Sequence, residues 1–149
     1  DTNAVNHDSD VSHHDSTCTY IHVVEYEVLN YKAGNWDPSF ADDFLIKTEA
    51  DIKIEVASNS DFLNVEFGSF DIESADPDSS HKWTAATQFI LNNSTWYWRL
   101  MDDDDNPIGD GDDFIAEGSF NAIQDGNGAF IESISADNTT KIRIHYDVR

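Results

Sequence analysis

The feature that most constrains the fold is a two-residue alternation that recurs along most of the chain. Residues 20–28, 44–57, 95–101 and 141–148 carry β-branched and aromatic residues at alternating positions. No segment carries an apolar stripe with a 3.6-residue period over more than two helical turns. The sequence therefore predicts strands throughout and no substantial helix.

Turn-forming sequences rich in Gly, Asn, Asp and Ser separate these strands. Further strands are expected at 62–74, as a strand pair or one bent strand, and at 86–91, 113–123 and 129–135. About eight short strands joined by such turns predict an all-β fold, an antiparallel eight-stranded β-sandwich. Residues 1–17 lack apolar periodicity, so we expect a flexible polar arm there and the sandwich over 18–149.

The charge of the chain restricts its partners. The formal net charge is −22, from 8 Lys+Arg and 30 Asp+Glu, which excludes nucleic acid because phosphates require a basic surface. Three interpretations remain: bound cations, a halophilic surface, or a surface that is simply solubilising. Aspartate outnumbers glutamate by 22 to 8, and the excess lies mostly in expected loops. Short carboxylates in loops favour sites for hard cations.

Residues 100–118 contain the densest acidic segment, with seven aspartates between Asp102 and Asp113. Carboxylates packed this closely repel one another unless a cation lies between them. The positions of this segment follow the ligand spacing of an EF-hand loop. However, Pro107 stands where that loop needs glycine, and a strand precedes the segment instead of a helix. We therefore expect oxygen coordination by these side chains without an EF-hand.

A second acidic segment spans 35–47, where Asp37 and Asp43 lie six positions apart and Asp43 is followed by Phe-Leu-Ile-Lys. The first segment contains Leu-Met-Asp-Asp-Asp at 100–104 and Asp-Phe-Ile-Ala-Glu at 113–117. These motifs resemble the calcium loops of the C2 domain, the calcium-dependent phospholipid-binding sandwich of eight antiparallel strands. Trp83 is similar to the tryptophan upstream of that family's sixth strand.

The resemblance implies a calcium site between two loops at one end of the sandwich. The segment after Asp104 is longer than the family's loop, which leaves the intermediate ligand open among Asp105, Asp110 and Asp112. The Lys and Arg residues are few and scattered, so phosphoinositide recognition is not expected. The predicted calcium ligands are Asp37, Asp43, Asp102, Asp104, Asp110 and Asp113.

Apolar residues interrupt both acidic segments. Trp36 and Phe40 flank the acidic cluster of the segment 35–47, and Ile108 follows Pro107 in the segment 100–118. A tryptophan in a polar loop suits the bilayer interface, because its ring is partly apolar and partly polar. We therefore predict that Trp36, Phe40 and Ile108 contact a membrane; an equally acceptable alternative is that Trp36 or Phe40 folds back onto the end of the sandwich.

The predicted function is a calcium-binding module that docks on anionic or zwitterionic membrane lipid through its calcium-loaded loops. One alternative is a calcium-stabilised carbohydrate- or protein-binding sandwich, in which Trp96 and Trp98 form a sugar platform if their shared face is exposed. The other is a halophilic domain with an acidic solvating surface. No enzyme is expected, because the chain has no Ser/His/Asp order, nucleophile elbow or glycine-rich phosphate loop.

Three features bear on location. Glycosylation sequons begin at Asn92, Asn93 and Asn138, and the chain starts at Asp1 rather than Met. No run of about 18 apolar residues is present. We expect a processed product or fragment that is secreted or extracellular and associates peripherally with membranes, either as a whole secreted protein or as part of a parent protein or larger assembly.

Overall fold

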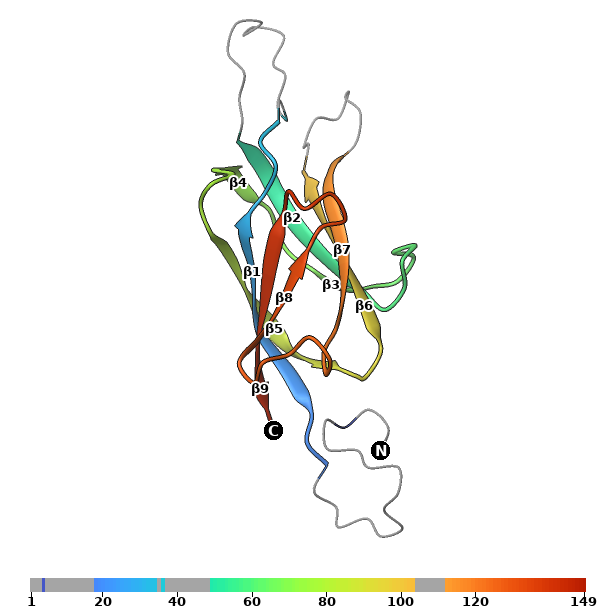
Figure 1. Cartoon of the computed structure of the whole chain (residues 1–149). Coiled ribbons are helices and arrows are strands. Elements are labelled where there is room, and N and C mark those ends of the chain that lie inside the picture. The colour runs from blue at the N-terminus through green and yellow to red at the C-terminus, as the bar shows by residue number, and fades with distance from the viewer. Residues whose placement is uncertain (1–3, 5–17, 35, 37–48, 104–111) are drawn as a thin grey trace, which may run out of the picture.

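The computed structural model describes residues 4, 18–34, 36, 49–103 and 112–149, with the side chains of residues 86–88 excepted. These residues form two antiparallel sheets and contain no helix (Figure 1). The strands are β1 (Ile21–Asn30), β2 (Ala50–Ala57), β3 (Val65–Gly68), β4 (Ile72–Ala75), β5 (His81–Leu91), β6 (Thr95–Asp102), β7 (Asp113–Asn121), β8 (Phe130–Ile134) and β9 (Lys141–Val148).

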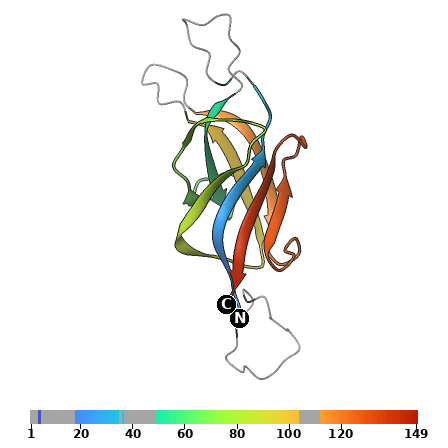
Figure 2. The same ribbon diagram turned by 90° about the vertical axis from the view of Figure 1, so that its left-hand side faces the viewer.

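One sheet has the strand order β5-β1-β9-β8, and the other has the order β3-β2-β6-β7, with β4 also paired to β2. Figure 2 shows the first sheet in front and the second behind it. The predicted all-β class and antiparallel two-sheet arrangement are therefore confirmed. The described residues hold nine strands where eight were expected, because the segment 62–74 contains two short strands, β3 and β4.

The space between the sheets is filled by alternate residues of the strands. In β2, Ile52 and Ile54 are fully buried while Lys53 stays partly exposed. In β6, Trp96 and Trp98 are buried at 5 % and 0 % exposure, so the condition for a sugar platform on this pair is not met. The two tryptophans belong to the core instead.

A buried hydrogen-bond relay connects the two sheets. The indole N–H of Trp98 donates to Ser133 Oγ at 2.8 Å, and Ser133 Oγ donates to the carbonyl of Ser119 at 2.8 Å. Ser133 lies on β8 of one sheet, whereas Trp98 and Ser119 lie on β6 and β7 of the other. The relay satisfies polar atoms that burial would otherwise penalise.

The set of residues that points into the core changes within β1, in the region 20–28 where a regular alternation was expected. The register with both β5 and β9 shifts between Val23 and Glu25, which marks a β-bulge. Ile21 is buried before the bulge and Tyr26 after it, so the inward set passes from odd to even positions. As a result Glu27, on the opposite side from Tyr26, faces outward.

Two expected strand boundaries differ from those observed. The strand expected at 86–91 begins earlier, at His81, so Trp83 lies within β5, where it is buried and its indole N–H donates to the Phe70 carbonyl at 2.8 Å. The strand expected at 44–57 is observed as β2 from Ala50, since 44–48 lies outside the described residues.

The strand ends that flank the two acidic segments lie at one pole of the sandwich, at the top of Figure 1. β1 runs toward this pole, β2 starts from it, β6 ends at it and β7 starts from it, with Ile52 opposite Asp102 and Asp102 opposite Asp113. At the other end, the N–H of Tyr20 donates to the Arg149 carbonyl at 2.6 Å. We call the first end the acidic pole, defined by Asp51, Asp102, Asp103, Asp112 and Asp113.

The packing of Trp98 makes a prediction about Gly118, its partner across β6 and β7. A Cβ atom at position 118 would lie 2.7 Å from Trp98 Cε2, closer than packed carbon atoms tolerate. We expect Gly118→Ala to lower the free energy of unfolding by about 1–3 kcal/mol in urea denaturation. Gly68→Ala is the matched control, because its Cβ would meet only Val65 Cγ1 at 3.7 Å. Equal stability of the two variants would contradict the account of the core.

Candidate functional site

The structure describes three of the predicted site residues: Asp102, Asp113 and Trp36. The remaining predicted calcium ligands and membrane-contacting residues lie outside the described residues, and these are Asp37, Asp43, Asp104, Asp110, Phe40 and Ile108. The described part of the candidate site therefore consists of the strand ends that flank the two acidic segments.

Asp102 is the last residue of β6 and its side chain is fully buried. Its Oδ1 accepts a hydrogen bond from the backbone N–H of Asp51 at 2.7 Å, and the Asp51 carbonyl accepts one from the N–H of Asp103 at 2.7 Å. Asp51 lies at the start of β2, shortly after the segment 35–47, whereas Asp102 and Asp103 open the segment 102–113. The strand ends of the two acidic segments are thus in direct contact.

Asp113 lies beside Asp102. The two residues are register partners across β6 and β7, and Asp113 is exposed where Asp102 is buried. Carboxylates at such neighbouring positions repel one another, more strongly when one of them is shielded from water. Asp102 and Asp113 are therefore adjacent, and the calcium site predicted for them stays a prediction.

Lys53 is a residue of the acidic pole that the sequence did not indicate. Its Nζ lies 2.8 Å from Asp103 Oδ1 and 2.5 Å from Asp112 Oδ2, the residues on either side of the segment 104–111. The hydrogen bond from Lys53 lowers the pKa of Asp112, with burial acting in the opposite direction. Lys53 therefore joins the two ends of this loop and neutralises part of its charge.

Tyr31 anchors the chain beneath the acidic pole. Its buried hydroxyl accepts a hydrogen bond from the N–H of Ala50 at 3.1 Å and donates one to the carbonyl of Ala75. Burial raises the pKa of Tyr31 to about 12, with the negative charge of Asp102 adding to the effect and the hydrogen bond from Ala50 opposing it. The hydroxyl thus stays neutral and ties the chain after β1 to β2 and β4.

The acidic pole carries more negative charge than its described partners compensate. Lys53 supplies one positive charge against the carboxylates defining the pole. Backbone amides bind two of these carboxylates, since the N–H of Ser74 also donates to Asp51 Oδ1 at 2.6 Å. Such hard oxygen atoms, concentrated at one end and only partly neutralised, are the donor set that calcium prefers.

Trp36 is half-buried and packs against the core at this pole. Its indole N–H donates to the carbonyl of Lys32 at 3.2 Å, and its ring lies over Gly34, where a Cβ would come within 2.6 Å of Cε2. This arrangement corresponds to the alternative in which Trp36 folds back onto the end of the sandwich. Membrane contact by Trp36 stays a prediction.

A second cluster of ligand-type side chains lies on the outer face of the β5-β1-β9-β8 sheet. The ligand atoms of Glu25, Glu27 and His145 lie within 4.8 Å of one another. Glu27 is buried, accepts a hydrogen bond from Ser80 Oγ at 2.6 Å, and its Oε2 lies 2.8 Å from His145 Nε2.

Basic side chains already neutralise this cluster. Lys82 Nζ lies 2.8 Å from Glu25 Oε1, and Arg143 Nη1 lies 3.7 Å from Glu27 Oε2. Burial raises the pKa of Glu27, but the hydrogen bonds of Ser80 and His145 and the charge of Lys82 outweigh it, so the net shift is downward. The cluster is therefore an ion-pair network. The basic residues are also less scattered than the sequence suggested. Strands β5 and β9 bring Lys82, Lys141 and Arg143 onto one face of the sheet, where glutamates pair with them.

Comparison with known proteins adds no family assignment: no protein-family model and no curated protein sequence matches the chain. Within the described residues, no helix has the length and apolar character needed to cross a bilayer.

The Lys53 bridge makes a prediction about stability. With calcium chelated at neutral pH, we expect Lys53→Met to lower the free energy of unfolding by about 1–2 kcal/mol, because Asp103 and Asp112 lose their shared partner. Because the pKa of Asp112 is lowered, its ion pair with Lys53 stabilises the folded state at pH values above the ordinary carboxyl pKa. This stabilisation is lost as the pH falls through the lowered pKa. The difference from wild type should therefore vanish in acid.

The matched control is Arg149→Met, which removes a cation from an exposed pair with Asp147. We expect its effect to stay within about 0.5 kcal/mol at every pH. Urea denaturation of both variants from pH 7 to pH 2 measures the comparison. A pH-independent loss in Lys53→Met would show that the side chain acts by packing and not by charge.

Proposed function

We propose that the acidic pole binds calcium and that the chain is a C2-like module docking on membrane phospholipid in its calcium-loaded state. The observation that carries the proposal is the contact of Asp51 with Asp102 and Asp103. It joins the strand ends of two acidic segments that lie about fifty residues apart in sequence. A site shared by both segments is what the resemblance to the C2 domain implies.

The electrostatics of the pole favour a divalent cation. The buried Asp102 and its neighbour Asp113 are both acidic, and Lys53 is engaged by Asp103 and Asp112. The neighbouring segments 37–48 and 104–111 add further aspartates in sequence. A divalent ion lowers the repulsion among these groups more than a monovalent ion does, and carboxylate oxygens are hard ligands suited to calcium.

Calcium at this pole would also act as the bridge to lipid. With a net charge of −22, the chain is repelled by anionic phospholipid until the pole is neutralised. Tyr20 and Arg149 meet at the opposite end of the sandwich, so that pair does not cover the acidic pole. Lipid phosphates then supply oxygen ligands to the bound calcium, and apolar residues of the two segments enter the interface.

Calorimetric titration tests calcium binding and its location. We expect wild type to bind calcium, with the affinity reduced by about tenfold or more in Asp102→Asn and in Asp43→Asn. The amide that replaces the Asp102 carboxylate keeps an oxygen that can accept the hydrogen bond from Asp51, so the fold is preserved while the charge is lost. Equal loss in both variants would place the two segments in one site.

Asp147→Asn is the control for general electrostatics. It removes the same charge from the opposite end, where Asp147 pairs with Arg149. We expect its calcium affinity to match that of wild type. If all three variants weaken binding alike, calcium interacts with the overall charge and the pole is not a site.

Liposome co-sedimentation tests membrane docking. The chain should pellet with phosphatidylserine/phosphatidylcholine vesicles in millimolar calcium and remain in the supernatant with chelator, because calcium provides the bridge. Asp102→Asn should need more calcium for the same pelleted fraction. Calcium binding without pelleting would retain the metal site and remove the membrane function.

The halophilic alternative predicts a different response. Calcium that binds the folded state adds about 2.7 kcal/mol to the free energy of unfolding when its concentration is a hundredfold above the dissociation constant. The melting temperature therefore rises with calcium. A solvating acidic surface responds to molar sodium chloride and shows little change with millimolar calcium. Melting curves in both series distinguish the two.

A further inference from the structure

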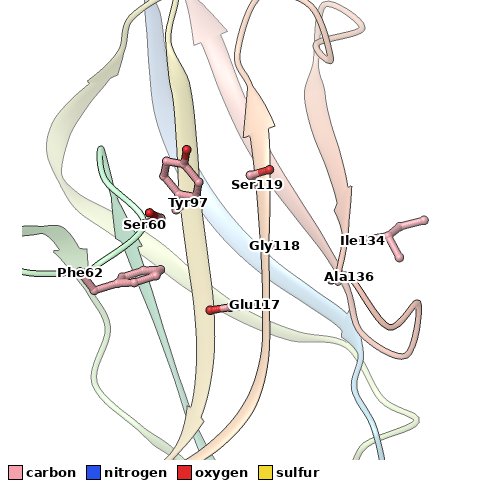
Figure 3. Close-up of a pocket in the computed structure, with 8 residues that line it drawn as sticks. All are labelled: Ser60, Phe62, Tyr97, Glu117, Gly118, Ser119, Ile134 and Ala136. Carbon is pink, nitrogen blue, oxygen red and sulfur yellow. The ribbon is translucent and has the colours of Figure 1, made fainter.

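A groove of about 310 Å³ lies on the outer face of the β3-β2-β6-β7 sheet, away from the acidic pole. In Figure 3, Phe62 and Tyr97 lie along one side of it, Ile134 and Ala136 lie along the other, and β7 passes between them. Its volume is at the lower end of the range of about 300–1,000 Å³ that is typical of small-molecule sites. Ser60, Glu117, Gly118 and Ser119 complete the lining.

Phe62 is held in place by an unusual backbone and a chain of contacts. Its φ angle is 53°, in the left-handed region that bulky residues rarely adopt. The guanidinium of Arg99 lies 4.5 Å from the centre of the Phe62 ring, and Arg99 Nε is 2.5 Å from Glu55 Oε2. Strain of this kind persists where surrounding contacts fix the conformation, and it often marks a binding site.

The polar groups of the groove are available to a ligand. In the part of the chain that the structure describes, the hydroxyls of Ser60, Tyr97 and Ser119 and the carboxylate of Glu117 form no hydrogen bond or ion pair. They offer both donors and acceptors. Aromatic rings on the same face offer flat apolar surface.

We propose that this groove binds a neutral saccharide. It is a binding site distinct from the acidic pole. A sugar ring presents C–H groups on its faces and hydroxyls around its edge. The faces match the rings of Tyr97 and Phe62, and the edge hydroxyls match Glu117 and the serines.

Charge decides against other ligand classes. The described lining contains no basic side chain, and the net charge of −22 opposes anionic sugars and phosphates. A cationic peptide would be attracted by that charge, but Glu117 is the one carboxylate among the described lining residues. The three hydroxyls suit the alternating donors and acceptors of a sugar better than a row of cations.

The proposal is tested by amide NMR of the full chain with neutral hexaoses: cellohexaose, xylohexaose, mannohexaose and laminarihexaose. At least one should shift the amides of Tyr97 and Glu117 in a saturable manner, both in calcium and in chelator. Persistence in chelator separates the groove from the calcium site, so each proposal can fail alone. Absence of a saturable shift at millimolar concentrations of all four sugars would overturn the saccharide assignment.

Variants locate the binding. Tyr97→Ala and Glu117→Gln should each weaken the affinity for the bound hexaose by about tenfold. Phe114→Ala is the matched control, because Phe114 is an aromatic residue on the same strand as Glu117, is 54 % exposed and does not line the groove. Unchanged affinity in Tyr97→Ala would contradict the proposal. A hexalysine peptide that shifts the same amides when the sugars do not would replace the saccharide with a cationic peptide.

Discussion

The structure depends on the contact between the start of β2 and the end of β6. The N–H of Asp51 donates to the buried carboxylate of Asp102, and the Asp51 carbonyl accepts from Asp103. These hydrogen bonds join the strand ends that flank the two acidic segments, in spite of the repulsion between neighbouring carboxylates. Burial of a carboxylate is costly unless hydrogen bonds and opposite charge compensate it. Among the residues that the structure describes, five carboxylates define the pole and Lys53 binds two of them, and this excess of acidic groups is the basis of the calcium proposal.

The rest of the sandwich supports that contact and separates three surfaces: the acidic pole and the outer faces of the two sheets. Trp98, Ser133 and Ser119 connect the sheets through the core, which keeps the register of β6 and β7 fixed at the pole. The outer face of one sheet carries the ion-pair network around Glu27, where each acid already has a cation. The outer face of the other carries the groove beside Phe62. Among the described residues, charge is thus compensated on the face around Glu27, whereas the carboxylates at the pole outnumber the lysine that binds two of them.

The sequence predicted the fold class because an alternating pattern depends only on near neighbours. The turns at 58–61 and 137–139 and the strand 141–148 followed from that local signal. The bulge at Val24 was not predictable, because both faces of β1 carry strand-forming residues and the pairing with β5 and β9 decides the inward set. Lys53 was missed for a similar reason: its partners Asp103 and Asp112 are brought to it only by the pairing of β2, β6 and β7. Asp102 and Asp113 could be proposed because aspartate density is visible in the sequence itself.

The most direct test of the account is a residue-resolved calcium titration followed by amide NMR, with sodium chloride added to a parallel sample at matched ionic strength. We expect the amides of Asp51, Asp103 and Asp113 to shift together and to saturate at the same calcium concentration, while sodium leaves them in place. Shifts confined to one of the two segments, or reproduced by sodium, would contradict a divalent-cation site shared by both.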